Sequence, residues 1–390
     1  MILPADDLAV DEPKPTALFA ATASAASANL WTSINGWAVP RVYTSVTEEY
    51  DAARAAAAVV DLGALARYTV RGPDAAAFLA RVTTAPVANL EPGESARGLI
   101  LDASGAVVDL IETARLAADL YLLTASRRHA RRLQLAGRGF DASVEDIMGQ
   151  VAALAILGPK ARDVAAAAGF EVASDALAVQ ARVRGVEASA RPIHHGALPG
   201  VEIIYPYEEA LTLWERLRRA AAPKPAGLDA LEILRIEGGA PRPGVDFIGA
   251  DEARNERSRR LPSEIGLAYL APVGRAWFNG RRALRAHPAE ARRLVVLAID
   301  AESCAPGAGI FSKKDAVGRL TSCAFSPRLK RVVAFADLAA GAGAKGLEVA
   351  VAGEAEERAA AEILQTPESR LAAAFRAAEG APTDSRGRPV

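Results

Sequence analysis

The chain has 390 residues and a net charge of −1, and this balance argues against a dedicated nucleic-acid-binding protein, which usually carries a strong basic excess. Its two cysteines, Cys304 and Cys323, cannot build a disulfide framework or a four-cysteine zinc site. No run of about 18 apolar residues occurs, so the sequence predicts no membrane-spanning helix.

Residues 1–28 are expected to be a flexible leader. Pro4, Pro13 and Pro15 interrupt it, and residues 16–28 are rich in Ala, Ser and Thr, although the alanines would also allow a helix. The leader lacks the basic start of a secretory signal, and its acids and missing arginines are unlike a transit peptide. We therefore expect a cytoplasmic protein, by elimination.

The first folded unit is expected over residues 29–150. Residues 48–60 are helix formers without Gly or Pro, and residues 68–72 predict a strand that ends in a turn. Pro73 then opens a helix over residues 74–81, because proline is tolerated in the first turn of a helix. The remaining elements are a β-hairpin, a strand and a basic helix, at residues 99–113, 119–125 and 127–135.

A second unit, residues 151–275, begins in the same way. Its apolar strand at residues 151–157 is followed by Gly158-Pro159 and a helix over 160–168, much as Gly72-Pro73 follows the first strand. The pattern predicts an internal pseudo-repeat of strand, Gly-Pro and helix, although so short a similarity can also arise by chance. The remaining elements are a strand and two helices, at residues 202–205, 207–220 and 229–236.

The last module, residues 276–365, has short strands joined by Gly-rich turns. Such spacing predicts a small β-barrel. Its strands are expected at residues 294–299, 317–322, 332–336 and 347–351. Residues 366–390 are a polar, Ala-rich tail that is expected to fray.

Common catalytic and nucleotide-binding motifs are missing from the sequence. It has no HExxH pair, no GxxxxGK[ST] or GxGxxG loop and no GxSxG elbow, so zinc proteases, NTPases and serine hydrolases have no support. His194 and His195 are adjacent, so on a strand they point to opposite faces and cannot bind one ion together. Either one of these histidines is packed inside the protein and the other is exposed, or His195 faces a substrate. The sequence predicts no bound metal.

Two carboxylates stand inside apolar strands, Asp109 within residues 107–111 and Glu202 within residues 201–204. A buried carboxylate costs free energy unless it is paired or solvated. Strand alternation can simply turn each side chain toward solvent. The functional alternative is a carboxylate in a cleft, where it handles a proton or binds a cationic amine.

Six stretches in the same order resemble the folate-dependent aminomethyltransferases, the family that includes the T-protein of the glycine cleavage system. The first three resemble the family's Phe-x-Gly-Trp-x-x-Pro opening, its hydrophobic-Phe-Asp-Val segment and its Leu-Asn-x-x-Gly-Gly-x-x-Asp hairpin. The last three resemble the family motifs Leu-Arg-Leu-Glu-Ala-Gly, Phe-Ile-Gly-Arg-x-Ala-Leu and Gly-x-x-Thr-Ser-x-x-Phe-Ser-Pro. In this chain the six stretches are residues 34–40, 59–62, 101–109, 234–239, 278–284 and 318–327.

The resemblance implies an α+β fold of three domains in a cloverleaf around a central folate pocket, with tetrahydrofolate as the one-carbon carrier. It implies that Asp109 lies near the accepting folate nitrogens, that Glu202 binds the pterin ring and that Arg235 lines the same pocket. Ser126 occupies the position of the asparagine in the family's Val-Val-Asn strand, which makes it a further cofactor-binding candidate. Substrate contacts are expected from Trp37, Asn35, His195 and Tyr269.

Departures from the family pattern cluster where the substrate should sit. The family's Asp-Asp pair is Asp109-Leu110 here, and its Gly-Tyr-Thr-Gly-Glu segment carries His195 for the tyrosine and Leu198 for the glutamate. A kept pterin pocket with an altered substrate wall predicts a divergent transferase that passes a methyl group from an O-, S- or N-methylated small molecule to tetrahydrofolate. His195 would activate the leaving heteroatom, and Asp109 would position the folate amine.

Three other functions remain open on the sequence alone. An orthodox glycine cleavage aminomethyltransferase would take its donor from a lipoyl carrier protein. A folate-binding iron–sulfur assembly factor usually carries Lys-Gly-Cys-Tyr-x-Gly-Gln-Glu, whereas residues 244–250 hold no cysteine here. A folate-binding protein without catalysis would fit the missing second acid.

Overall fold

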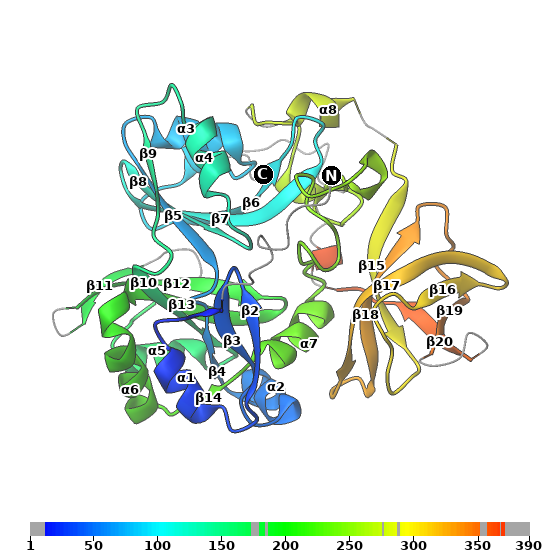
Figure 1. Cartoon of the computed structure of the whole chain (residues 1–390), viewed down its shortest axis with the longest axis horizontal. Helices are drawn as coiled ribbons and strands as arrows, with labels where there is room; N and C mark the ends of the chain where they lie inside the picture. Colours follow the sequence, from blue (N-terminus) through cyan, green and yellow to red (C-terminus); the bar gives the residue numbers. More distant parts are fainter. Residues whose placement is uncertain are drawn as a thin grey trace.

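The computed structural model describes residues 12–172, 179–183, 186–274, 277–286, 289–351, 357–366 and 368–370. These residues form three lobes around a common centre, two of mixed α and β structure and one β-barrel (Figure 1). The expected three-part α+β architecture, with a small barrel as its last part, is confirmed. Among these residues no helix combines the length and the apolar character that crossing a membrane requires.

The first mixed lobe is built on a five-stranded sheet with the strand order β6-β7-β8-β5-β9. Helices α3 and α4 share its core, where Phe78 and Leu133 are buried together with Tyr68 and Leu123. The elements are β5 (Ala66–Arg71), α3 (Ala75–Val82), η2 (Val87–Asn89), β6 (Ser95–Leu101), β7 (Val107–Ala117), β8 (Leu120–Ala125), α4 (Ala130–Ala136) and β9 (Ser143–Asp146). The hairpin predicted at residues 99–113 is the β6–β7 pair.

The second mixed lobe is built on a six-stranded sheet with the order β11-β12-β13-β10-β4-β14. Its elements are α2 (Val46–Ala55), β4 (Ala58–Asp61), β10 (Val151–Leu157), α5 (Ala161–Ala167), β11 (Val179–Val183), β12 (Val186–His195), β13 (Leu198–Pro206), η3 (Tyr207–Glu209), α6 (Ala210–Ala220), β14 (Lys224–Pro225) and α7 (Leu228–Gly238). The helix predicted over residues 48–60 ends at Ala55, and Val59 and Val60 lie in β4 instead. Two buried β-branched residues between neighbouring strands favour the sheet more than the nearby alanines favour the helix.

The two mixed lobes share one strand order, as the Gly-Pro pattern predicts. In the first sheet β5 pairs with β8 and β9, and in the second β10 pairs with β13 and β4. Strand β4 leads into β5 in the chain and β9 leads into β10, but β4 lies in the sheet of β10 and β9 in the sheet of β5. The strand that precedes each central strand is thus exchanged between the two sheets. Gly72 and Gly158 end the two central strands with φ values of 138° and 133°, and an added Cβ would lie 2.4 and 2.5 Å from backbone oxygens. Only glycine is accommodated there.

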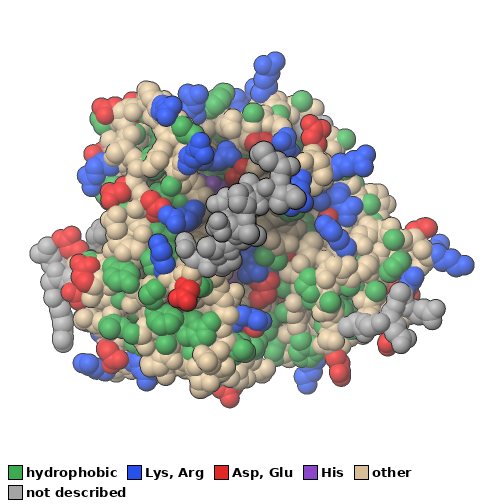
Figure 2. Space-filling model, viewed as in Figure 1, with side chains coloured by type: hydrophobic (Ala, Val, Ile, Leu, Met, Phe, Trp, Pro, Cys, Tyr) green, Lys and Arg blue, Asp and Glu red, His purple; other side chains and the backbone are tan. Residues whose placement is uncertain are grey.

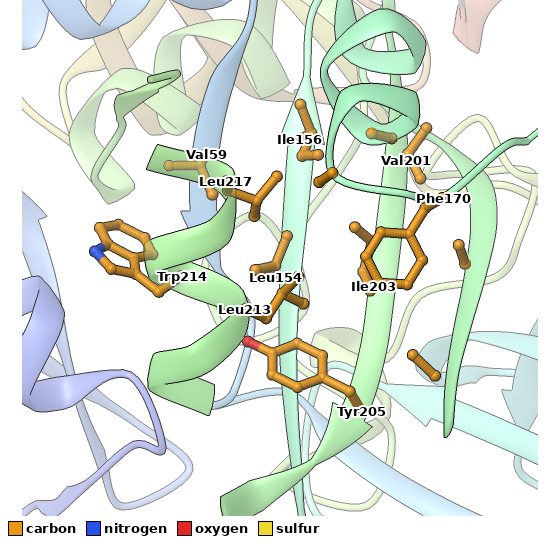
Figure 3. Packing of buried hydrophobic residues seen from close by; sticks show 14 of the residues in the cluster. Val59, Leu154, Ile156, Phe170, Val201, Ile203, Tyr205, Leu213, Trp214 and Leu217 are labelled. Atoms are coloured by element: carbon orange, nitrogen blue, oxygen red, sulfur yellow. The ribbon is translucent and has the colours of Figure 1, made fainter. Parts of the chain in front are cut away.

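Strand alternation divides the second sheet between two cores. Leu154 and Ile156 of β10 pack with Trp214 of α6 on one face (Figure 3). Leu157, one residue further along, belongs to the core formed with α2 and α7 on the other face. The second sheet is thus covered on both sides, and α7 lies on the side toward the centre of the molecule (Figure 1).

Residues 12–28, expected to belong to a flexible leader, are folded. Strand β1 (Lys14–Pro15) pairs with β3 (Trp37–Val42), which pairs with β2 (Leu30–Ile34). Helix α1 (Phe19–Ala25) follows Leu18, which is 1% exposed in the same core as α6. The apolar burial of Leu18 stabilises a segment whose composition favours disorder. Residues 1–11 of the expected leader lie outside the described residues.

The third lobe is a closed barrel with the strand order β15-β18-β17-β16-β19-β20. The connecting segment and the barrel contain η4 (Glu256–Ser258), η5 (Ala268–Leu270), α8 (Arg281–Arg285), β15 (Arg292–Ile299), β16 (Gly309–Ser312), β17 (Asp315–Ser326), β18 (Arg331–Ala339), β19 (Leu347–Ala350) and β20 (Arg358–Ile363). The four predicted strands are β15, β17, β18 and β19. The barrel docks on α7, where Ile236 is buried with Val333 and Phe335. Of the predicted tail, residues 371–390 lie outside the described residues, whereas Glu368 is buried.

Candidate functional site

A cavity of about 290 Å³ lies between the two mixed lobes, beside α7. Its walls are largely apolar and include Leu62, Leu157, Ile193 and Leu231. Its polar groups converge from both sheets and from α7; among them are Glu112, Thr124, Arg191, His195, Glu202 and Arg235. An apolar pocket with a few convergent polar groups is the usual form of a small-molecule site.

Regular periodicity explains why the polar side chains meet here. In β13 Val201 and Ile203 point into the core shown in Figure 3, so Glu202 between them points to the opposite face. On α7 the lining residues Leu228, Leu231 and Arg235 are spaced three and four apart, which places them on one side of the helix.

Glu202 is the centre of a buried ion network. Its Oε1 accepts a hydrogen bond from Nη2 of Arg67 at 2.7 Å, and its Oε2 accepts one from Nε of Arg191 at 2.6 Å. Burial alone would raise the pKa of Glu202, but Arg191 and Arg67 together lower it to about 2. Arg191 also donates to Oε1 of Glu112 at 2.5 Å, so the network runs from one sheet to the other. The cavity therefore holds a carboxylate that is ionised at neutral pH.

His195 is neutral, and its tautomer follows from its hydrogen bond. Its Nε2 lies 3.0 Å from the carbonyl oxygen of Leu231, which can only accept, so Nε2 carries the proton. Burial lowers the pKa of His195, and the nearby Arg235 lowers it further. Nδ1 of the ring is therefore unprotonated, and it accepts no hydrogen bond from the described residues.

Close packing of two glycines holds His195 against α7. Gly196 follows His195 with a φ of 57°, and a Cβ on Gly238 would lie 2.3 Å from the Cα of Gly196. A larger residue at Gly238 would push the β12–β13 turn away from the helix. The Gly238-Gly239 pair therefore sets the position of His195 as well as the end of α7.

Arg235 lines the cavity, but protein groups use all five of its N–H donors. Nε and Nη2 donate to the two carboxylate oxygens of Glu232 at 2.9 and 2.6 Å, and Nη2 also donates to Oγ of Ser322 at 2.9 Å. Nη1 donates to Asp246 at 2.6 Å and to the Ala240 carbonyl at 2.8 Å. Arg235 thus ties α7 to strand β17 of the barrel and shapes the cavity wall.

Asp109 lies on the other face of its strand. Glu112 lines the cavity, so Leu110 shares its face and Asp109 points the opposite way. The carboxylate of Asp109 is fully buried and accepts hydrogen bonds from the backbone N–H of Leu110 at 2.8 Å and of Arg127 at 3.1 Å. Its Oδ2 lies 2.8 Å from Nε2 of His129. Asp109 is therefore not among the described residues that line the cavity.

Three of the other predicted site residues, Asn35, Trp37 and Ser126, are not among the residues that line the cavity. Asn35 adopts a φ of 52° before Gly36 in the tight turn between β2 and β3, and its side chain donates to the carbonyls of Ala64 at 2.8 Å and Ser126 at 3.0 Å. Ser126 therefore takes part through its backbone carbonyl, which accepts the hydrogen bond from Asn35. The ring of Trp37 lies against Gly149. The contacts of Asn35 hold the turn that follows the lining residue Ile34 against the segments of Ala64 and Ser126.

Tyr269 belongs to a separate polar cluster near the cavity. Its hydroxyl donates to Glu368, which also accepts from Arg97 at 2.6 Å. Arg97 pairs directly with Glu112 in the β6–β7 register, so this cluster adjoins the cavity lining without being part of it. The structure thus gathers His195, Glu202 and Arg235 around one cavity, and the other predicted site residues are not among those that line it.

Sequence reasoning missed Thr124, which lies two residues before Ser126. Its buried Oγ1 has no hydrogen-bond partner in the described part of the chain, and Thr124 lines the cavity. An unpaired buried hydroxyl costs free energy unless a ligand satisfies it. Period-two alternation from Ser126 would have pointed to Thr124.

Comparisons with known proteins agree on one family. Residues 20–255 match the family model described as the GCVT N-terminal domain, and residues 292–368 match the glycine cleavage T-protein C-terminal barrel domain. The chain is 30% identical to a probable aminomethyltransferase of Haloarcula marismortui, over 78% of this chain and 86% of that protein. It is 31% identical to an aminomethyltransferase of Thermus thermophilus, over 79% of this chain and 86% of that protein.

A solved structure has the same fold. The glycine cleavage system aminomethyltransferase T from Bartonella henselae superposes with a TM-score of 0.80, at 22% identity, over 91% of this chain and 98% of that chain. At this level of identity the likeness concerns the fold alone. The expected cloverleaf arrangement is confirmed by it.

Proposed function

The chain belongs to the glycine cleavage T-protein family of aminomethyltransferases, and on that premise we propose that it transfers a one-carbon unit from an aminomethyl donor to tetrahydrofolate in the cavity between its mixed lobes. As a member of this family it is a tetrahydrofolate-dependent one-carbon transferase. The observation that carries the proposal is the meeting of ionised Glu202, unpaired Thr124 and neutral His195 at one apolar cavity.

Glu202 and Thr124 would bind the pterin ring. A carboxylate has about four lone-pair positions, and Arg67 and Arg191 occupy only part of them, so it can still accept from an N–H of the pterin edge. Thr124 offers a hydroxyl that either donates or accepts. The two arginines keep the carboxylate ionised and in one orientation before the ligand arrives.

His195 would handle a proton during transfer. When bound, tetrahydrofolate supplies the amine nitrogen that accepts the carbon. That nitrogen loses a proton as its new bond to carbon forms, and the unprotonated Nδ1 of His195 is suited to take the proton up. Leu62, Leu157 and Leu231 exclude water from the same space, which strengthens each polar contact within it.

A methylated small molecule is the second candidate donor, and one observation favours it. Leu110 occupies the second position of the family's Asp-Asp pair and lies on the strand face that carries Glu112. An apolar residue at that position suits a methyl-bearing donor better than an amine-bearing one. In that case the product would be 5-methyltetrahydrofolate rather than the methylene form.

Product analysis separates the two donors. The purified protein is incubated with tetrahydrofolate and either an aminomethyl-loaded lipoyl carrier protein or a panel of N-, O- and S-methylated small molecules. Ammonia release with formation of methylenetetrahydrofolate from the loaded carrier supports the proposal. Formation of 5-methyltetrahydrofolate from a methylated donor alone overturns it in favour of the second candidate. Absence of tetrahydrofolate binding by calorimetry overturns both.

A further inference from the structure

A second depression in the surface, unrelated to the cavity, lies beside helix α4. It encloses about 640 Å³ and is lined by Arg128, His129, Arg131, Arg132, Leu135, Ala136 and Asp251. None of these residues lines the cavity between the mixed lobes. Figure 2 shows Lys and Arg side chains gathered on the part of this face where Figure 1 draws α4. We call this depression the α4 groove.

The floor of the α4 groove is a buried histidine held by a buried carboxylate. The side chain of His129 is 3% exposed and that of Asp109 is fully buried, with Nε2 and Oδ2 separated by 2.8 Å. The backbone N–H of His129 donates to the hydroxyl of Tyr68 at 2.6 Å, which fixes the residue further. Because Nε2 is engaged by Asp109, Nδ1 is the ring nitrogen available to the groove. In the described part of the chain Nδ1 has no hydrogen-bond partner.

The rim of the groove carries an excess of guanidinium groups. Arg128 is engaged with Asp146 at 2.9 Å, and Arg132 lies 3.5 Å from Asp251. Arg131 is exposed and forms no ion pair among the described residues. Three arginines therefore face one lining carboxylate, and Arg131 is free to bind an anion.

From this arrangement we infer that the α4 groove is a binding site for the phosphate or carboxylate group of a small molecule. Arg131 supplies the unpaired charge, with Arg128 and Arg132 beside it, and Nδ1 of His129 supplies a hydrogen bond from the floor. Nδ1 donates that bond where it carries a proton, and otherwise accepts one from a protonated phosphate oxygen. Exposed Leu135 offers apolar surface to the rest of the ligand. Asp109 acts here as a positioning residue, through His129.

The test uses the full chain and two probes, inorganic phosphate and glutarate, at constant ionic strength, because surface electrostatics depends on salt. Calorimetry gives the affinity, expected at a Kd of about 1 mM or tighter. The chain has four histidines, so imidazole proton NMR resolves each one, and the His129→Gln variant assigns the signal. Binding should shift the His129 signal and leave those of the other three in place. Phosphate and glutarate as separate arms show which oxyanion the site prefers.

Arg131→Gln and Arg138→Gln provide a matched pair of variants. Both remove one exposed charge near α4, but Arg138 does not line the groove. Arg131→Gln should weaken binding about threefold or more, whereas Arg138→Gln should leave it unchanged. Equal weakening by both variants would mean diffuse attraction to a basic surface, and would overturn the inference. So would the absence of heat and of any His129 shift with either probe.

Discussion

Arg191 and Glu202 stand directly opposite one another in the β12–β13 register, and Nε of Arg191 lies 2.6 Å from Oε2 of Glu202. Arg191 extends further to Glu112 of the other sheet. One guanidinium therefore joins both mixed lobes at the cavity while it fixes the carboxylate proposed to bind the pterin ring. Stability and ligand binding are coupled at this pair.

Glu202→Gln should lower the free energy of unfolding by about 3–5 kcal/mol, because it leaves the buried Arg67 and Arg191 without their shared counter-charge. Urea unfolding monitored by circular dichroism measures the loss. Glu208→Gln, which removes an exposed carboxylate just after β13, is the control and should change stability little. A Glu202→Gln protein as stable as the parent would contradict the network.

Because the carboxylate of Glu202 is ionised in the folded protein, we expect the protein to lose stability in acid. Its folded-state pKa of about 2 lies below the ordinary value of 4.5, so its contribution is present above pH 4.5 and disappears as the pH falls toward 2. The difference corresponds to about 3 kcal/mol. Unfolding free energies measured between pH 5 and pH 3 should fall more steeply for the parent than for Glu202→Gln. Parallel curves would show that Glu202 has the same pKa in the folded and the unfolded chain, and would contradict the lowered folded-state value.

His195 predicts a second pH effect, in a higher range. Burial lowers its folded-state pKa below 6.5, so the unfolded chain takes up a proton at a pH where the folded chain does not. Stability contributed by neutral His195 is therefore present above pH 6.5 and is lost as the pH falls below it. His195→Gln should unfold with less dependence on pH between 7.5 and 5.5 than the parent. His194→Gln, which changes the exposed neighbour, should behave as the parent does.

Thr124→Val should separate binding from stability. Valine keeps the shape of threonine and removes a buried hydroxyl that has no partner among the described residues, so stability should be unchanged or rise by about 1 kcal/mol. Tetrahydrofolate binding should weaken by about two- to tenfold, measured by calorimetry. Thr113→Val is the matched control, because Thr113 also has an unpaired buried hydroxyl but does not line the cavity. Equal affinities for all three proteins would remove Thr124 from the site.

Arg235→Lys should loosen the barrel from α7. Lysine has three donors and no planar fork, so at least two of the five hydrogen bonds made by Arg235 are lost, at a cost of about 2–4 kcal/mol. Chemical unfolding and the rate of limited proteolysis measure this. Arg218→Lys on the exposed end of α6 is the control. Resistance to protease equal to that of the parent would show that the apolar contacts of Ile236 suffice to hold the barrel.

The sequence by itself determined the elements whose signals are local. The apolar run at residues 151–157 and the Gly-Pro pairs after both central strands predicted the pseudo-repeat, and short strands with Gly-rich turns predicted the barrel. Six ordered motifs predicted the family. For Glu202 the apolar neighbours left two alternatives open, a side chain turned toward solvent or a carboxylate in a cleft, and the structure buries it.

Only the tertiary structure decided which partners those are. Arg67 lies 135 residues from Glu202 in the chain, and the exchange of β4 and β9 between the sheets depends on long-range pairing that no local pattern encodes. The face of β7 that meets the cavity also depended on how the two sheets pack. Alternation states that Asp109 and Leu110 point in opposite directions, but not which of them points inward. The helices of the first lobe cover one side of its sheet, and the second lobe covers the other side. Asp109 therefore points toward His129 on the helix side, and Leu110 lies on the same side as Glu112, which lines the cavity.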